Sequence, residues 1–397
     1  MKINNISGIN MASASSNTRY GKRDDSLLIL IEKGSTISGR FTNNSFKSAP
    51  VITAKAHLKR CAGKEIILII NAGNANAGTG KKGAKDVLLC CKSVGKEMGI
   101  DPECVLPFST GVIGEHLKTD EYIGAFVKAS KRLKSNNWKR AASSILTTDT
   151  KPKLISRVIK NGSERIAITG FAKGSGMIRP DFATLLSFVF IDAKINRPLL
   201  DNIHSEALSE SFNRITVDGD TSPNDSSVLV ASGRTKSPIK RGTPIERKIR
   251  SGVIEIYKEL ADLLIKDAEG ATKKITIKVV QAKTEKQAES VAFTVAESPL
   301  VKTAMFGNDA NWGRILSAIG RSPEVNDVSK TSIHLNGVPL AKNGNLHPQH
   351  SESKASKAIT KKNLDVTVKL GLGKSTFSVI TSDFSEDYLL INSDYRS

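Results

Sequence analysis

Residues 174–188 read GSGMIRPDFATLLSF. The glycines at the start leave the backbone free to turn, and the largely apolar run after Thr184 predicts a buried strand over 185–192. A single threonine therefore stands at the entrance to a buried strand. Threonine is a favoured strand residue, so one interpretation is purely structural. The other is that the Thr184 hydroxyl is a nucleophile, and the rest of the sequence has to decide between the two.

Short runs rich in isoleucine and valine alternate with amphipathic patterns along the chain. The runs predict strands over 26–32, 65–71, 165–170 and 274–280. The amphipathic patterns predict helices over 83–99, 119–133, 197–212, 245–267 and 285–296. After residue 330 the pattern predicts short strands over 332–336, 365–370 and 375–380, with an exposed loop over 341–356. This alternation predicts a mixed α/β (α+β) fold with a smaller unit at the C-terminal end.

The composition is that of a globular protein, with 39% hydrophobic and 25% charged residues among 397. The apolar runs are too short to span a bilayer, and the first residues lack the apolar core of a signal peptide. The four cysteines match no zinc-binding spacing and predict reduced, buried thiols. We therefore expect a cytoplasmic protein.

The net charge of +20 needs an explanation, because basic proteins often bind nucleic acids or membrane surfaces. No three basic residues are consecutive here, and only 5% of residues are aromatic. No strand interleaves aromatic and basic residues as base-stacking surfaces do. We therefore expect neither a nucleic acid nor a membrane as partner, and interpret the charge as a solvated basic surface that favours carboxylate substrates.

The sequence matches three known functional motifs only in part. Segment 71–82, NAGNANAGTGKK, lacks the glycine and the hydroxyl residue that a phosphate-binding P-loop needs at positions 75 and 82. Ser175 lies between glycines at the wrong spacing for a hydrolase nucleophile elbow. The acidic stretch 218–225 has Pro223 where a calcium loop needs glycine, so we interpret it as a tight turn. We expect no metal site.

Other segments carry groups suited to acyl transfer, although each is a weak signal by itself. In FSTGVIGE (108–115), a turn would place the Thr110 hydroxyl beside the Gly111 N–H, a pair that can stabilise an oxyanion. In TTDTK (147–151), Asp149 can form an Asx turn that leaves hydroxyls exposed. Glu269 ends a long helix, where an acid is electrostatically unfavourable. It either grips an amine or is a tolerated exposed residue.

The order of these segments is more specific than any one of them. GRFTNNSFKSAPV at 39–51 is followed by NAGNANAGTG, STGVIGE, TTDT, AKGSGMI-x-P-x-x-AT, ITVDGDTSPND, AEGATK, SPLVKTAMFGNDANWGR and NSDY. In FGNDANWGR, Asp309 or Asn311 is expected to cap a helix. With these motifs over essentially its whole length, the sequence resembles the bacterial ornithine acetyltransferase family, the bifunctional glutamate N-acetyltransferases of arginine biosynthesis.

The resemblance implies a layered α/β/β/α sandwich of the ornithine acetyltransferase type, with a smaller C-terminal α+β domain from about 285 to 397. It also implies self-cleavage between Ala183 and Thr184, which gives an α chain of residues 1–183 and a β chain of residues 184–397. The two chains would assemble as an α2β2 heterotetramer. N2-acetylornithine would acetylate Thr184, whose freed α-amine serves as base, and glutamate would then take the acetyl group without any cofactor.

Residue roles are carried over from the family position by position. Thr110 and the Gly111 N–H would hold the oxyanion, Lys173 would suit an α-carboxylate, and Glu269 the δ-ammonium of ornithine. The substrate-binding positions implied in this way are Thr150, Lys173, Thr184, Glu269, Asn392 and Ser397.

The chain departs from the family pattern in two places. It has Arg179, Asp181 and Phe182 before the cut, and it ends in Arg396-Ser397. These departures bear on substrate specificity and less on the chemistry. Whether acetyl-coenzyme A is a further acetyl donor stays open.

Two alternatives remain on the sequence. A related self-cleaving N-terminal-nucleophile amidase or aminopeptidase would hand the acyl group to water. A basic nucleic-acid-binding protein would show steeply salt-dependent binding and no acetyl transfer. Acetylornithine supplied together with glutamate separates them, because only the transferase makes N-acetylglutamate faster than acetate.

Overall fold

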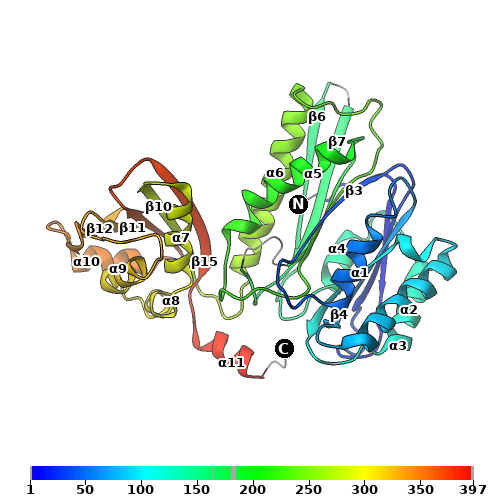
Figure 1. The fold of residues 1–397 in the computed structure, drawn as a ribbon, viewed down its shortest axis with the longest axis horizontal. Coiled ribbons are helices and arrows are strands. Elements are labelled where there is room, and N and C mark those ends of the chain that lie inside the picture. The colour runs from blue at the N-terminus through cyan, green and yellow to red at the C-terminus, as the bar shows by residue number, and fades with distance from the viewer. Residues whose placement is uncertain (1, 163, 180–184, 395–397) are drawn as a thin grey trace.

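The computed structural model describes residues 2–162, 164–179 and 185–394, which form three β-sheets with flanking helices (Figure 1). Two sheets lie face to face in a layered body. The third sheet belongs to a C-terminal unit that stands beside this body, to the left in Figure 1.

The first sheet has the strand order β1-β2-β4-β5, with β1 (Ile9–Ala14), β2 (Ser26–Ile31), β4 (Ile66–Asn74) and β5 (Val105–Val112). Neighbours pair antiparallel except β4 and β5, which run parallel. Alternation along β4 sends Leu68 and Ile70 to the second sheet, and Ile67 and Ile69 to the outer face. Helices α2 (Gly80–Met98) and α3 (Thr119–Ser130) cover that outer face.

The second sheet has the order β3-β9-β8-β7-β6, with β3 (Thr36–Phe41), β6 (Lys153–Asn161), β7 (Glu164–Lys173), β8 (Leu186–Ile191) and β9 (Ser226–Ala231). Phe188 and Phe190 of β8 point to the first sheet, and Val189 and Ile191 to the outer face. That face is covered by α5 (Arg197–Ser209) and α6 (Pro244–Lys266). The layers therefore run helix, sheet, sheet, helix, which confirms the expected α/β/β/α sandwich.

Aromatic rings fill the space between the two sheets. The ring centroids of Phe171 and Phe188 are 5.5 Å apart, and those of Trp138 and Phe190 are 5.4 Å apart. Helices α1 (Ala49–His57) and α4 (Trp138–Ser144) contribute to the same core. The second sheet combines strands from the two halves of the chain. β3 and β7, which precede residue 180, pair with β9 and β8, which follow residue 184.

The C-terminal unit has the strand order β13-β12-β11-β14-β10-β15. Its strands are β10 (Lys274–Ala282), β11 (Ser332–Leu335), β12 (Val338–Lys342), β13 (Asn345–Leu346), β14 (Asn363–Lys369) and β15 (Ser375–Ser382). Four helices share its core: α7 (Glu285–Ala296), α8 (Pro299–Phe306), α9 (Trp312–Gly320) and α10 (Glu352–Ile359). Helix α11 (Glu386–Asp394) follows β15 and lies below the gap between the unit and the body in Figure 1.

Two local expectations are wrong. The segment 341–356, expected as an exposed loop, contains β13 and the first turns of α10, which Ser351 caps by accepting the Lys354 N–H at 3.4 Å. Thr110 and Gly111, expected in a turn, lie in β5 because its parallel pairing with β4 continues to Val112. In contrast, Asn311 caps α9 as expected, accepting the Arg314 N–H at 2.9 Å.

All four cysteines are free and buried, as the sequence predicts. Burial raises the pKa of Cys61 to about 11 and the pKa of Cys90 to about 12, so these thiols stay protonated and unreactive. Among the described residues, no helix combines the length and apolar character needed to cross a membrane.

Candidate active site

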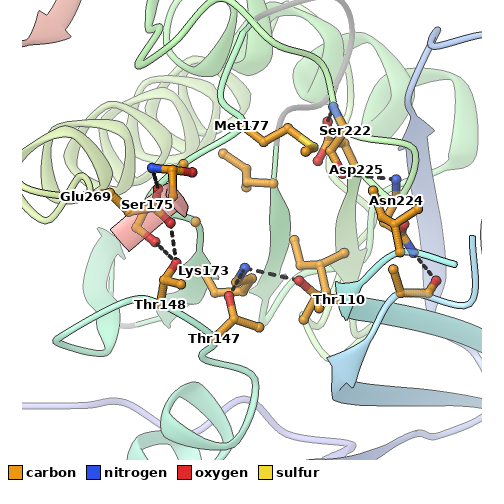
Figure 2. Close-up of a pocket in the computed structure, with 18 residues that line it drawn as sticks. Thr110, Thr147, Thr148, Lys173, Ser175, Met177, Ser222, Asn224, Asp225 and Glu269 are labelled. Atoms are coloured by element: carbon orange, nitrogen blue, oxygen red, sulfur yellow. Dashed lines mark hydrogen bonds between the residues drawn. The ribbon is translucent and has the colours of Figure 1, made fainter. Parts of the chain in front are cut away.

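A cavity opens in the layered body where the ends of β5 and β7 meet the start of β8 (Figure 2). The segment after α6 and the C-terminal helix α11 complete its wall. Its described lining residues are Ala75, Thr110, Gly111, Ile113, Thr147, Thr148, Lys173, Gly174, Ser175, Gly176, Met177, Leu185, Leu186, Ser222, Asn224, Asp225, Glu269 and Asn392. Five of the six predicted site residues that the structure describes line this one cavity: Thr110, Gly111, Lys173, Glu269 and Asn392.

Thr110 and Gly111 occupy the end of β5, where the backbone of β4 approaches unusually closely. Gly111 has a φ of +133°, and a Cβ atom there would lie 2.3 Å from the carbonyl carbon of Gly73. Only glycine fits such a position. The contact fixes the Gly111 backbone at the cavity wall, directly after the Thr110 hydroxyl in the chain.

Lys173 brings a buried cation to the same wall. Its Nζ donates to Thr147 Oγ1 at 2.8 Å and to Thr110 Oγ1 at 3.1 Å. Because the Thr110 oxygen accepts this bond, its own hydrogen remains available to a group in the cavity. Burial lowers the pKa of Lys173, an effect that the Asp149 carboxylate, 3.8 Å from Nζ, opposes.

Asp149 anchors this cation and the segment around it. Its Oδ1 accepts from Lys153 Nζ at 2.5 Å and from the Gly174 N–H at 2.8 Å. Its Oδ2 accepts the Thr147 N–H at 3.3 Å, a bond to the residue two positions earlier and not the Asx turn expected from the sequence. Burial by itself would raise the pKa of Asp149, but Lys173 and Lys153 hold that pKa below its ordinary value. Asp149 is therefore an ionised carboxylate enclosed by donors.

Glu269 presents a carboxylate from the side of the cavity that lies away from Thr110 (Figure 2). Its Oε1 accepts from Thr148 Oγ1 at 2.6 Å and its Oε2 accepts from Asn392 Nδ2 at 2.9 Å. A Cβ atom at Gly176 would lie 2.3 Å from Glu269 Oε2, so glycine is needed there to make room for the carboxylate. Glu269 is buried, and the interpretation of it as a tolerated exposed residue is therefore wrong.

The remaining predicted residues lie elsewhere or outside the described chain. Thr150 does not line the cavity; its backbone N–H and its hydroxyl both donate to Asp267, the former at 3.0 Å. Ala183, Thr184 and Ser397 fall outside the described residues. Leu185, which directly follows Thr184 in the sequence, does line the cavity.

Two lining residues that the sequence interpretation missed are Asn224 and Asp225. The stretch 218–225, expected as a tight turn, begins with a local turn in which Asp218 Oδ1 accepts the Asp220 N–H at 3.3 Å. That turn does not explain Asn224 or Asp225, which face the cavity. Burial raises the pKa of Asp225 well above its ordinary value, although hydrogen bonds from Ser222 and the charge of Lys173 oppose this.

The lining can therefore hold a small molecule with a cationic end at Glu269 and an anionic group at Lys173, and can polarise a carbonyl at Thr110 and Gly111. In the part of the chain that the structure describes, no group of three or more His, Cys, Asp or Glu side chains is placed to hold a metal ion.

Comparisons with known proteins agree on one family. The model of the ArgJ family matches residues 10–397. A Methylococcus capsulatus protein named arginine biosynthesis bifunctional protein ArgJ is 42% identical over 394 residues, which cover 99% of this chain and 96% of that protein. A protein of the same name from Pseudomonas fluorescens is 39% identical over 396 residues, covering 99% of this chain and 97% of that protein.

Among solved structures, the crystal structure of arginine biosynthesis bifunctional protein ArgJ from Bacillus halodurans is 34% identical, with a TM-score of 0.49. It covers 51% of this chain and 96% of its own. By the family model and the full-length relatives, this chain belongs to the ArgJ family.

Proposed function

We propose that this chain transfers the acetyl group of N2-acetylornithine to glutamate, giving ornithine and N-acetylglutamate. Its relatives are named bifunctional enzymes of arginine biosynthesis. The observation that carries the proposal is the cavity itself, which brings the opposite charges of Lys173 and Glu269 together with Thr110 and Gly111. This pattern suits an amino acid with a second amine and an acetylated nitrogen.

The nucleophile in this proposal is Thr184, freed by self-cleavage after Ala183. An N-terminal amine has a pKa of about 7.7–8.0, so it can take the proton of its own hydroxyl near neutral pH. Support comes from Leu185, which lines the cavity and follows Thr184 in the sequence. Acetylation of Thr184 and its deacetylation by glutamate would make a ping-pong cycle.

The described residues then have separate tasks. The Thr110 hydroxyl, whose oxygen accepts from Lys173, and the Gly111 N–H would stabilise the oxyanion. Lys173 would bind the substrate α-carboxylate, and Glu269, oriented by Thr148 and Asn392, the δ-ammonium of ornithine. Thr150 and Ser397 stay predictions as substrate contacts.

Three finer points belong to the same proposal. Acetyl-coenzyme A would be a second acetyl donor, as the bifunctional name of the relatives suggests. Four buried, free thiols suit the reducing cytoplasm. The two chains would assemble as an α2β2 heterotetramer, by resemblance to the family.

Mass spectrometry of the purified protein under denaturing conditions tests the nucleophile. We expect two fragments that meet at Ala183/Thr184, and an acetyl adduct on the second fragment after mixing with acetylornithine. Thr184→Ala should stay whole and lose turnover, because it removes the hydroxyl that attacks the acetyl group in the proposed cycle. An intact chain with full transferase activity would overturn the mechanism, and acetate released faster than N-acetylglutamate would favour an amidase.

A further inference from the structure

Asp225 stands beside the residue that follows the proposed nucleophile. Strands β8 and β9 are parallel, with Leu186 opposite Ser226, and the Ser226 N–H donates to the Leu185 carbonyl at 2.8 Å. Residue 225 therefore lies next to Leu185 at the point where both strands begin. Both residues line the cavity, and Asp225 is 4% exposed.

The segment that carries Asp225 is held firmly by its surroundings. The Asp225 carbonyl accepts the Thr42 N–H at 3.0 Å, and Thr42 Oγ1 donates to the Ser222 carbonyl at 2.8 Å. Asn224 Nδ2 donates to the Ala75 carbonyl at 2.7 Å. These bonds join the segment to the residues that directly follow β3 of the second sheet and β4 of the first, so the Asp225 carboxyl has a fixed position in the wall.

The hydrogen bonds of Asp225 differ from those of Asp149, the other buried aspartate beside the cavity. Asp149 is surrounded by two lysines and several N–H donors. Within the described chain, the Asp225 carboxyl accepts from Ser222 only, whose N–H lies 3.1 Å from Oδ2. A buried carboxyl with so few donors is more stable as the neutral acid, and the raised pKa of Asp225 agrees with this.

The position of Asp225 relative to Glu269 places the Asp225 carboxyl on the side where the reacting nitrogen of the substrate would lie. Figure 2 shows Glu269 and Thr148 on one side of the cavity, Asp225 and Asn224 on the other, and Lys173 and Thr110 between them. A substrate whose ammonium lies at Glu269 would carry its acetylated nitrogen toward the Asp225 side.

We propose that Asp225 is a further catalytic residue, a neutral carboxylic acid that gives its proton to the amine nitrogen leaving the acetyl group. This rests on the proposed function, with Thr184 as nucleophile. The Thr184 hydroxyl proton passes to the α-amine as Oγ attacks. When the tetrahedral intermediate collapses, the C–N bond breaks and the nitrogen takes the proton of Asp225. The α-ammonium then returns a proton to the Asp225 carboxylate.

The second half-reaction runs the same steps backward. The α-amine first takes the proton of Asp225, and the amine of glutamate then attacks the acetyl-threonine and gives a proton to the carboxylate. The α-ammonium finally protonates the departing Oγ. Over both halves no proton is gained or lost, and neither a metal nor an oxidant takes part.

The test compares two acetyl donors on Asp225→Asn, a variant that keeps the shape but cannot transfer a proton. Ornithine is a poor leaving group without a proton, whereas p-nitrophenyl acetate releases a nitrophenolate that needs none. We expect acetylation by acetylornithine to fall roughly 10²-fold or more. Acetylation by p-nitrophenyl acetate, followed as the nitrophenolate burst, should stay within a few-fold of wild type. Equal losses with both donors, or no loss with acetylornithine, would overturn the proposal.

The controls separate this proposal from the one on which it rests. Asp220→Asn changes an exposed acid of the same segment and should leave both rates unchanged. Wild-type protein that forms no acetyl adduct on the fragment starting at Thr184 contradicts the nucleophile, not Asp225. If Asp225→Asn remains uncut, Asp225→Glu is compared instead: a larger loss with acetylornithine than with the ester supports the acid, and equal losses contradict it.

Discussion

Two buried lysines, one in each part of the molecule, have different surroundings. Lys173 lines the cavity of the layered body, where Nζ donates to the hydroxyls of Thr110 and Thr147. Lys302, on α8 of the C-terminal unit, is fully buried. Its Nζ donates to Thr381 Oγ1 at 2.8 Å and to the Ser382 carbonyl, and lies 4.4 Å from the centre of the Phe384 ring.

Burial lowers the pKa of both lysines, and that of Lys302 to about 7. The difference lies in what the ammonium groups contact. The Lys302 partners belong to β15 and the residues after it and hold α8 in place. The hydroxyl partners of Lys173 border a cavity, and Asp149 compensates its charge. A buried lysine therefore indicates a functional site only where its hydrogen-bond partners can also contact a ligand. Burial of the charge is not evidence by itself, because buried charge pairs contribute little net stability.

Replacing each lysine by methionine should give the largest contrast. We expect Lys173→Met to lower turnover roughly 10- to 100-fold, because it removes charge-assisted hydrogen bonds worth about 1.5–3 kcal/mol. Lys302→Met should keep the turnover of wild type. Steady-state rates with acetylornithine and glutamate measure both. A similar loss in the two variants would remove the distinction between them.

The pH dependence of stability should distinguish the lysines next. Above pH 7 the folded chain carries Lys302 largely neutral, whereas the unfolded chain keeps this proton up to about pH 10.4. The contribution of Lys302 to the free energy of unfolding therefore rises with pH in this window, by up to about 1.4 kcal/mol per unit. Urea unfolding in the uncut Thr184→Ala background, with and without Lys302→Met, measures it. A difference between them that is constant from pH 7.5 to 9.5 would contradict the lowered pKa.

The smallest expected effects come from the hydroxyl partners. Thr147→Val should lower turnover about 2- to 10-fold, because Lys173 loses one hydrogen bond worth about 0.5–1.5 kcal/mol but retains Thr110. Thr381→Val, the matched change beside Lys302, should leave turnover unchanged and lower the melting temperature. Reversed outcomes would place the functional lysine in the C-terminal unit.

The sequence predicted those features that depend on interactions between residues close together in the chain. The helix α7 has the expected bounds, and its start follows from Thr284, which caps it by accepting the Gln287 N–H at 3.1 Å. Glu269 was signalled by its unfavourable place after a helix. Asp225 was not, because its role depends on the parallel pairing of β8 and β9, which joins residues about 40 positions apart. The contact between Lys173 and Thr147 is equally invisible in the sequence pattern.

The stacking of the two sheets was expected from the family resemblance and not from the pattern of strands and helices. The nearly continuous apolar runs of β4 and β8 indicate that both faces of these strands are buried, but they do not indicate which sheet or helix layer covers which face.

The interleaved strands of the second sheet imply that the chain would fold before it is cut, and that unfolding after the cut would be hard to reverse. A cut between Ala183 and Thr184 would leave β8 and β9 on one fragment, enclosed by β7 and β3 of the other. The fragments cannot separate without breaking backbone ladders at two strand pairs, so the cut protein stays together without a covalent link. Once denatured, however, they must find each other as two molecules. We expect heat to inactivate the cut enzyme irreversibly, while the uncut chain refolds.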